Sequence, residues 1–66
     1  MPARMYRLEI AENLSEDALG VFDGMTVSPD HGATVLVGPI SDKAQSYKLL
    51  RRVYELGLTL VSLKPI

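Results

Sequence analysis

The chain has 66 residues, of which 47% are hydrophobic, and it contains no cysteine. A chain of this length forms a single small core, and without cysteine it has no disulfide, zinc-thiolate site or thiol nucleophile. Its seven basic and eight acidic residues give a net charge of -1, which disfavours nucleic acid as a partner, because binding nucleic acid depends on an excess of Lys and Arg.

No apolar stretch approaches the roughly 20 residues of a membrane span, and the N-terminal segment lacks the apolar region of a signal peptide. We therefore expect one domain over residues 1–66, located in the cytoplasm and without contact to a membrane. A core this small also makes self-association a natural source of added stability. The expected assembly is a homodimer.

Two elements are expected in the first third of the chain. Residues 5–11 alternate between apolar and polar side chains, which is typical of a half-buried strand. The motif "NLSE" that begins at Asn13 indicates a helix N-terminus with a capping box, and Gly24 is a suitable C-terminal residue. A short helix is therefore predicted between these two positions. Its apolar residues fall at helical spacing: Leu14, Ala18, Leu19 and Phe22.

The middle of the chain predicts a β-hairpin. A strand over residues 25–28 is expected to stop at Pro29, and a second strand over residues 33–37 is expected to stop at Gly38. Between them, "PDHG" has the residue types of a tight turn, and we expect His31 to be exposed at its tip.

The last third predicts a longer helix and a strand. Ser41 is a suitable N-cap, Gly57 a suitable C-terminal residue, and residues 59–64 alternate again. At 100° per residue the helix has one stripe facing the core, formed by Ser46, Leu49, Leu50, Val53 and Leu56.

The predicted order is strand, helix, strand, strand, helix, strand. Two right-handed crossovers joined by a hairpin give an α+β fold, the ferredoxin-like βαββαβ two-layer sandwich. Its antiparallel sheet has the order 4-1-3-2, with two helices on one face. A strand-swapped dimer of the same elements is the alternative.

No group of residues in the sequence has the composition of a catalytic, metal or cofactor site. His31 is the only histidine and lacks further ligands or a nucleophile in its neighbourhood. The carboxylates occupy helix ends and polar faces, and the glycines match neither the dinucleotide fingerprint nor the P-loop. We therefore expect no enzymatic activity, no cofactor and no metal.

Two surfaces are candidates for an interface. The first is the open face of the predicted sheet, where we place Arg7, Glu9, Leu36 and Leu60. The second is a ridge on the longer helix, formed by Tyr47, Leu50 and Tyr54 at positions i, i+3 and i+7. Either these rings pack at the margin of the core, or they contact a partner.

The segments "FDGMT" and "TVLVGPISDKAQSYKLLRRVYELGLTLVSLKPI" resemble a family of small, mostly uncharacterised bacterial proteins. The shared pattern begins with a strand start of the form Phe-Asp/Glu-Gly-Met/Leu-Thr. It continues through Thr-Val-Leu-x-Gly-Pro and Asp-x-Ala-x-x-x-x-Leu-Leu to Leu-Gly-Leu-x-Leu-x-Ser-x-x-Pro. The chain departs from this pattern at Ser46, where the family more often has an apolar residue, and at Tyr47, where histidine is frequent. The resemblance implies no particular chemistry.

The predicted element order is also loosely similar to that of ACT domains, which pair through their sheets and often bind amino acids near the first turn. That similarity implies a ligand turn at Glu12, Asn13 and Ser15, although the usual Asp-x-Pro-Gly entry is absent. Two functions follow as hypotheses. The first is a non-enzymatic interaction or regulatory module that self-associates through its sheet face or an edge strand, and the alternative is an amino-acid sensor.

Overall fold

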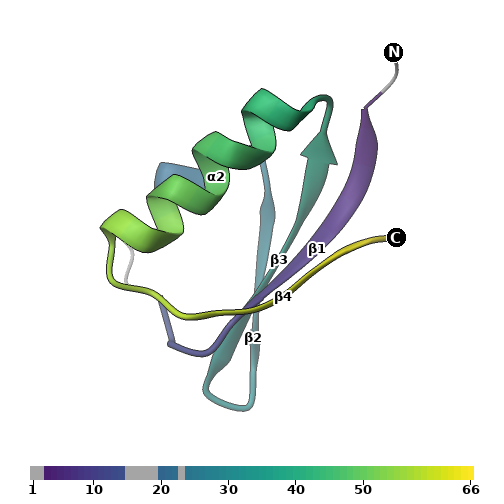
Figure 1. Ribbon diagram of the computed structural model, residues 1–66. Helices are drawn as coiled ribbons and strands as arrows, with labels where there is room; N and C mark the ends of the chain where they lie inside the picture. The colour runs from purple at the N-terminus through teal and green to yellow at the C-terminus, as the bar shows by residue number, and fades with distance from the viewer. Residues whose placement is uncertain (1–2, 15–19, 23) are drawn as a thin grey trace.

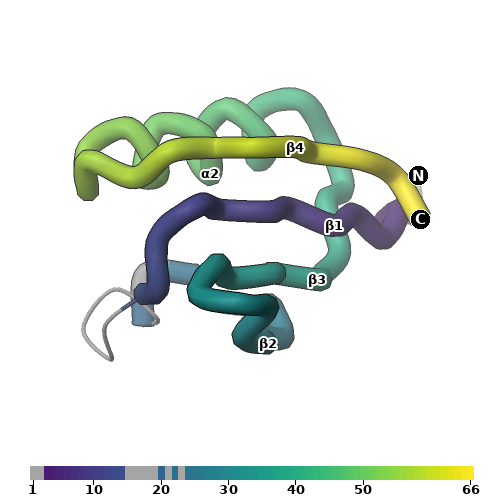
Figure 2. The backbone as a smooth tube through the Cα atoms, turned by 90° about the horizontal axis from the view of Figure 1, so that it is seen from below, coloured from purple at the N-terminus to yellow at the C-terminus, as the bar shows by residue number. Residues whose placement is uncertain are grey.

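Four antiparallel strands and one long helix make up most of the described structure. The computed structural model describes residues 3–14, 20–22 and 24–66. Its elements are β1 (Arg4–Ile10), a 3₁₀ helix η1 (Gly20–Phe22), β2 (Thr26–Asp30), β3 (Ala33–Ile40), α2 (Lys43–Glu55) and β4 (Leu60–Pro65). The sheet order is β2-β3-β1-β4, so β1 and β3 are central and β2 and β4 are edges. One side of the sheet carries α2, as Figures 1 and 2 show from two directions.

The predicted ferredoxin-like fold, a two-layer βαββαβ sandwich with two helices on one face, is contradicted by the structure. The strand order counted from the β4 edge is 4-1-3-2. In the ranges described, α2 is the single α-helix, and η1 lies where the end of the first predicted helix was expected. The remainder of that prediction, residues 15–19 and 23, lies outside the described residues. Gly20 starts η1, and a glycine inside so short a segment opposes the costly nucleation of an α-helix.

The hairpin between β2 and β3 has a two-residue turn. Asp30 pairs with Ala33, and both intervening residues have positive φ, 51° at His31 and 86° at Gly32. Two successive positive φ angles define a type I′ turn, whose twist matches that of the adjoining strands. His31 is exposed at the tip, as the sequence predicted.

Both strands of this hairpin extend further than predicted, since β2 includes Pro29 and β3 includes Gly38 and Pro39. Pro39 follows the last β3 residue that pairs with β2, Val37, so its missing N–H leaves no gap in that ladder. Gly38 allows the side chain of Met25 to approach closely, because a Cβ atom at this position would lie 2.8 Å from Met25 Cγ.

Side-chain and backbone hydrogen bonds define both ends of α2. Asp42, rather than the predicted Ser41, is the N-cap, and its carboxylate accepts from the backbone N of Gln45 at 2.8 Å. The Gln45 side-chain oxygen in turn accepts from the backbone N and the Oγ of Ser41. The side chain of one residue thus accepts from the first turn of the helix while a side chain of that turn accepts from the segment before it, a reciprocal arrangement similar to a capping box. At the other end Gly57 has φ 71° and donates to Tyr54 O, and Leu58 N donates to Val53 O; the two bonds form a Schellman motif.

The core lies between the sheet and α2. It contains Leu8, Ile10, Phe22, Leu36 and Val53, all of them buried. Leu8 is paired with Leu36 across β1 and β3, and Val53 is the buried residue of α2. No helix in the described ranges is long and apolar enough to cross a membrane.

Candidate functional site

The side of the sheet opposite α2 has two rows of side chains running across all four strands. The pairing of β1 with its neighbours sets these rows. One row is Lys64, Arg7, Val37 and Thr26, and the other is Ser62, Glu9, Val35 and Ser28. We call these eight residues the open face.

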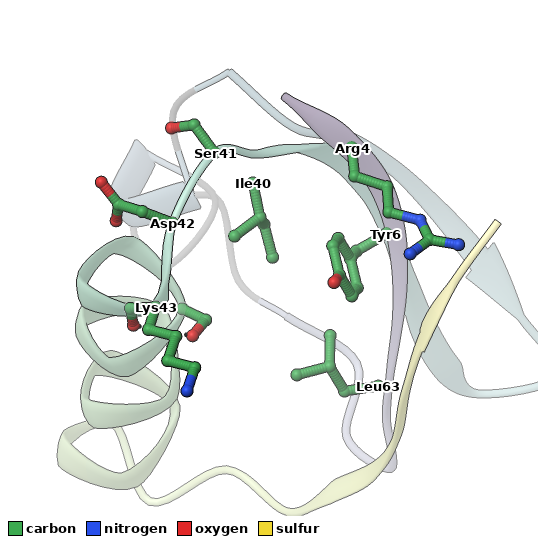
Figure 3. Close-up of a pocket in the computed structure, with 8 residues that line it drawn as sticks. Arg4, Tyr6, Ile40, Ser41, Asp42, Lys43 and Leu63 are labelled. Carbon is green, nitrogen blue, oxygen red and sulfur yellow. Dashed lines mark hydrogen bonds between the residues drawn. The ribbon is translucent and has the colours of Figure 1, made fainter. Parts of the chain in front are cut away.

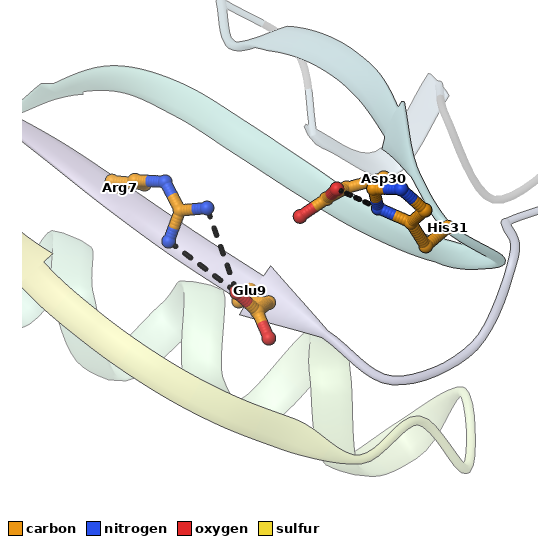
Figure 4. Close-up of polar contacts among 4 residues, drawn as sticks. All are labelled: Arg7, Glu9, Asp30 and His31. Carbon is orange, nitrogen blue, oxygen red and sulfur yellow. Dashed lines mark hydrogen bonds and ion pairs between the residues drawn. The ribbon is translucent and has the colours of Figure 1, made fainter.

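An ion pair and two valines occupy the centre of the open face. Arg7 and Glu9 lie two residues apart on β1, and both terminal nitrogens of Arg7 lie 3.5 Å from Glu9 Oε1 (Figure 4). Their side chains are 36% and 29% exposed, so a partner could still reach both charges. Val35 is only 8% exposed beside them. The centre is therefore a small apolar patch bordered by two opposite charges.

The prediction that Leu36 and Leu60 lie on the open face is wrong. Leu36 is fully buried because it pairs with Leu8, on the side covered by α2. Leu60 pairs with Ile10 and packs against the same core. A single-residue change in register exchanges the two faces of a strand, and the apolar run around Leu36 has no alternation that would reveal its orientation.

Each edge strand has a proline whose nitrogen faces away from the sheet. Ile66 donates to Met5 O at 2.9 Å, and in an antiparallel ladder alternate residues point to opposite sides, so Pro65 points to the free edge of β4. The two-residue turn orients β2 in the same manner, because Asp30 faces β3 and Pro29 then faces outward. A proline cannot donate to an added strand, so both edges resist backbone pairing.

The outward side of α2 exposes the two predicted tyrosines. Tyr47 is 66% exposed and Tyr54 is 84% exposed, so neither ring packs at the margin of the core. Arg51 lies between them in sequence and is 3.8 Å from Glu55, an i,i+4 ion pair on the exposed surface. Such a pair contributes little to stability, on the order of 0.5 kcal/mol.

The predicted ligand turn is occupied by internal hydrogen bonds. Thr34, which is buried, donates from Oγ1 to the carbonyl of Glu12 at 2.9 Å and accepts from Leu14 N at 3.2 Å. The Glu12 carboxylate accepts from the backbone N of Thr59 at 2.6 Å. These bonds connect the segment after β1 to β3 and to the segment before β4. The role of Thr34 in holding this segment was not predicted, although Thr34 has the one side-chain hydroxyl in the otherwise apolar strand β3.

The hydrogen bond from Thr59 lowers the pKa of Glu12 below its ordinary value of 4.5. The backbone N–H stabilises the ionised carboxylate, which favours loss of the proton. Asn13 lies beside a cavity of about 270 Å³, and Ser15 lies outside the described residues.

His31 has one polar neighbour. Its Nδ1 atom lies 2.8 Å from Asp30 Oδ1 at the tip of the hairpin, so the two side chains are in contact (Figure 4). Catalysis or metal binding would need further groups that converge on the same point. The part of the chain that the structure describes contains no group of three or more His, Cys, Asp or Glu side chains able to hold a metal ion.

A cavity of about 460 Å³ lies on the other side of the sheet, between the start of α2 and strands β1 and β4 (Figure 3). A second cavity of about 200 Å³ lies beside Met25 and the opposite flank of α2. Sequence analysis predicted neither cavity.

Comparison with protein families gives one match. A family model described as "Domain of unknown function (DUF8691)" matches residues 5–64. Neither the curated proteins nor the solved structures contain a match. The model covers almost the whole chain, including β2, β3 and α2 in full and all of β1 and β4 except Arg4 and Pro65. The chain therefore belongs to the DUF8691 family.

Proposed function

We propose that the protein is a non-enzymatic interaction module of the cytoplasm and that it pairs with a second copy of itself through the open face. The observation that carries the proposal is the arrangement at its centre, where Val35 and Val37 lie beside the Arg7–Glu9 ion pair. An exposed sheet face with an apolar centre and charged neighbours is suited to packing against another sheet.

The charges on this face are complementary to themselves. In a two-fold symmetric dimer the same patch faces itself, so Arg7 of each copy can approach Glu9 of the other. The pair within one copy, at 3.5 Å, is long enough to exchange for such contacts at little cost. Burial of the accessible part of Val37 and of the aliphatic stem of Arg7 supplies the apolar contribution, because Val35 is already buried in one copy.

The outward prolines favour the face over the edges. Pairing through β2 or β4 would place Pro29 or Pro65 where an added strand needs a donor. Packing of one face on another uses side chains alone and is unaffected by these residues.

The size of the open face indicates a weak dimer. Four strands spaced about 4.8 Å apart, with about five residues rising about 3.3 Å each, cover on the order of 300 Å² per copy. A standard interface buries roughly 800 Å² on each partner. We therefore expect a dissociation constant of about 0.1 mM, within the range of transient interfaces.

Light scattering over a dilution series tests the proposal. From about 10 µM to about 1 mM the mean mass should rise from the monomer's 7.2 kDa toward twice that value. The Arg7→Glu variant places like charges against each other and should remain monomeric. The double variant Arg7→Glu with Glu9→Arg restores complementarity and should dimerise again.

A matched control is Lys48→Glu, which makes the same replacement of a positive by a negative charge at an exposed position of α2 and should leave dimerisation unchanged. A wild-type chain that stays monomeric throughout the series would refute the proposal, as would a double variant that fails to recover while its circular dichroism remains native. A thermal-shift panel of amino acids tests the sensor hypothesis, because ligand binding stabilises the folded state. A saturable shift that Asn13→Ala abolishes would favour the sensor instead.

A further inference from the structure

The cavity between α2 and the β1–β4 side of the sheet is an apolar groove with charged walls. Its volume is about 460 Å³, within the range of small-molecule sites. Tyr6, Ile40 and Leu63 point into the space, as Figure 3 shows, and form its apolar floor. Arg4 stands on the strand wall, with its guanidinium at the outer rim beyond Tyr6, and Lys43 stands on the helix wall.

The groove is open because one position of the core-facing stripe of α2 has a short side chain. Ser46 lies in this stripe together with Leu49 and Val53 and lines the groove. Its hydroxyl donates to the carbonyl of Lys43 at 2.8 Å and therefore turns back onto the helix. A larger apolar residue at position 46 would fill the space that Ser46 leaves.

The charges at the groove are predominantly positive. Arg4 and Lys43 take part in none of the ion pairs among residues 3–14, 20–22 and 24–66. Asp42 is the one acidic residue of the lining, but its carboxylate accepts from Gln45 N at 2.8 Å and points away from the groove (Figure 3). Two cations without ion-pair partners thus border an apolar floor.

We propose that this groove binds a small amphipathic carboxylate, with its apolar body on Tyr6, Ile40 and Leu63 and its carboxylate at the rim, where Arg4 and Lys43 supply positive charge. The apolar floor favours a hydrocarbon or aromatic body, and the two cations favour an anionic head group over a neutral or cationic one. The groove lies on the side of the sheet opposite the open face. This binding is therefore independent of the pairing proposed above.

Octanoate is a suitable probe, and its binding can be followed by titration calorimetry and by amide NMR of the full chain. We expect saturable binding with a dissociation constant of about 1 mM or tighter, because small ligands on half-open sites bind weakly. The amide shifts should centre on Tyr6, Ile40 and Leu63. Octanol, which has the same body without the charge, should bind at least about fivefold more weakly, and octylammonium should not bind.

Three variants separate this site from non-specific association. Lys43→Gln should weaken octanoate binding by about three- to tenfold, because it removes one of the two cations. The matched control Lys48→Gln removes a cation from the opposite flank of α2 and should leave the affinity unchanged. Ser46→Leu should fill the groove and abolish binding while the chain remains folded.

The proposal is overturned if octanoate shows no saturable binding, if octanol binds equally well, or if Ser46→Leu binds octanoate with unchanged affinity. Arg7→Glu should bind octanoate like the wild type even when it no longer dimerises. The two proposals can therefore fail separately.

Discussion

Replacement of Thr34 by valine tests how the segment after β1 is held to the sheet. The substitution keeps the shape of a buried β-branched side chain but removes the hydroxyl that bonds both Glu12 O and Leu14 N. Each lost bond leaves a backbone group without its partner, and because both residues are only partly buried we take about 1 kcal/mol for each, near the lower end of the usual penalty. The free energy of unfolding should therefore fall by about 2 kcal/mol.

Urea denaturation followed by circular dichroism measures this loss, which for a chain of this size corresponds to a fall in Tm of about 8–16 °C. Thr26→Val is the matched control, because Thr26 is exposed on β2 and its substitution should change stability by less than about 0.5 kcal/mol. Amide exchange at Leu14 should also become faster in Thr34→Val. If Thr34→Val unfolds within about 0.5 kcal/mol of the wild type, the two hydrogen bonds do not hold the segment and the explanation is refuted.

Three further predictions concern local features of the fold. The pKa of Glu12 is lowered in the folded state, so the ionised carboxylate stabilises the fold above the ordinary value of 4.5, and this contribution is lost as pH falls through the folded pKa. In Glu12→Gln the free energy of unfolding should therefore depend less steeply on pH below 4.5, as measured by urea midpoints at a series of pH values. Gly38→Ala should destabilise the chain by about 1–3 kcal/mol, because the new Cβ would meet Met25 Cγ at 2.8 Å. Met25→Ala should destabilise the Gly38→Ala variant less than it destabilises the wild type, because it removes the clash. If the destabilising effects of the two substitutions are simply additive in thermal melts, the proposed clash is contradicted. His31→Asn should raise the free energy of unfolding by about 0.5 kcal/mol, because asparagine adopts positive φ more readily than histidine at a type I′ turn; an unchanged or lower urea midpoint would count against this account.

The two candidate surfaces illustrate how far side-chain patterns identify a site. Alternation in β1 places Arg7 and Glu9 together on one face, and helical spacing places Tyr47 and Tyr54 on one exposed side of α2. No comparable pattern exists in β3, where successive residues are apolar on both faces. Its orientation follows from the pairing of Leu36 with Leu8, a contact between residues far apart in the chain.

The groove is a tertiary feature of the same kind. Ser46 stands out in the sequence as a polar residue in the core-facing stripe of the helix, but a short side chain there can equally be covered by a neighbour. The space remains because no side chain of β1 or β4 fills it. Arg4 and Lys43 come from distant parts of the chain and line the same groove only in the folded structure.

Local sequence by itself determined the four strands, the length of α2, its glycine terminus and the exposed turn at His31, because each depends on residues only a few positions apart. Four features depend on the tertiary structure alone: the position of α2 on one side of the sheet, the register of β3, the outward direction of Pro29 and Pro65, and the groove beside Ser46. The reason is physical: period and capping are set by neighbours along the chain, whereas the choice of buried face is set by whichever pairing of distant strands removes the most apolar surface from water.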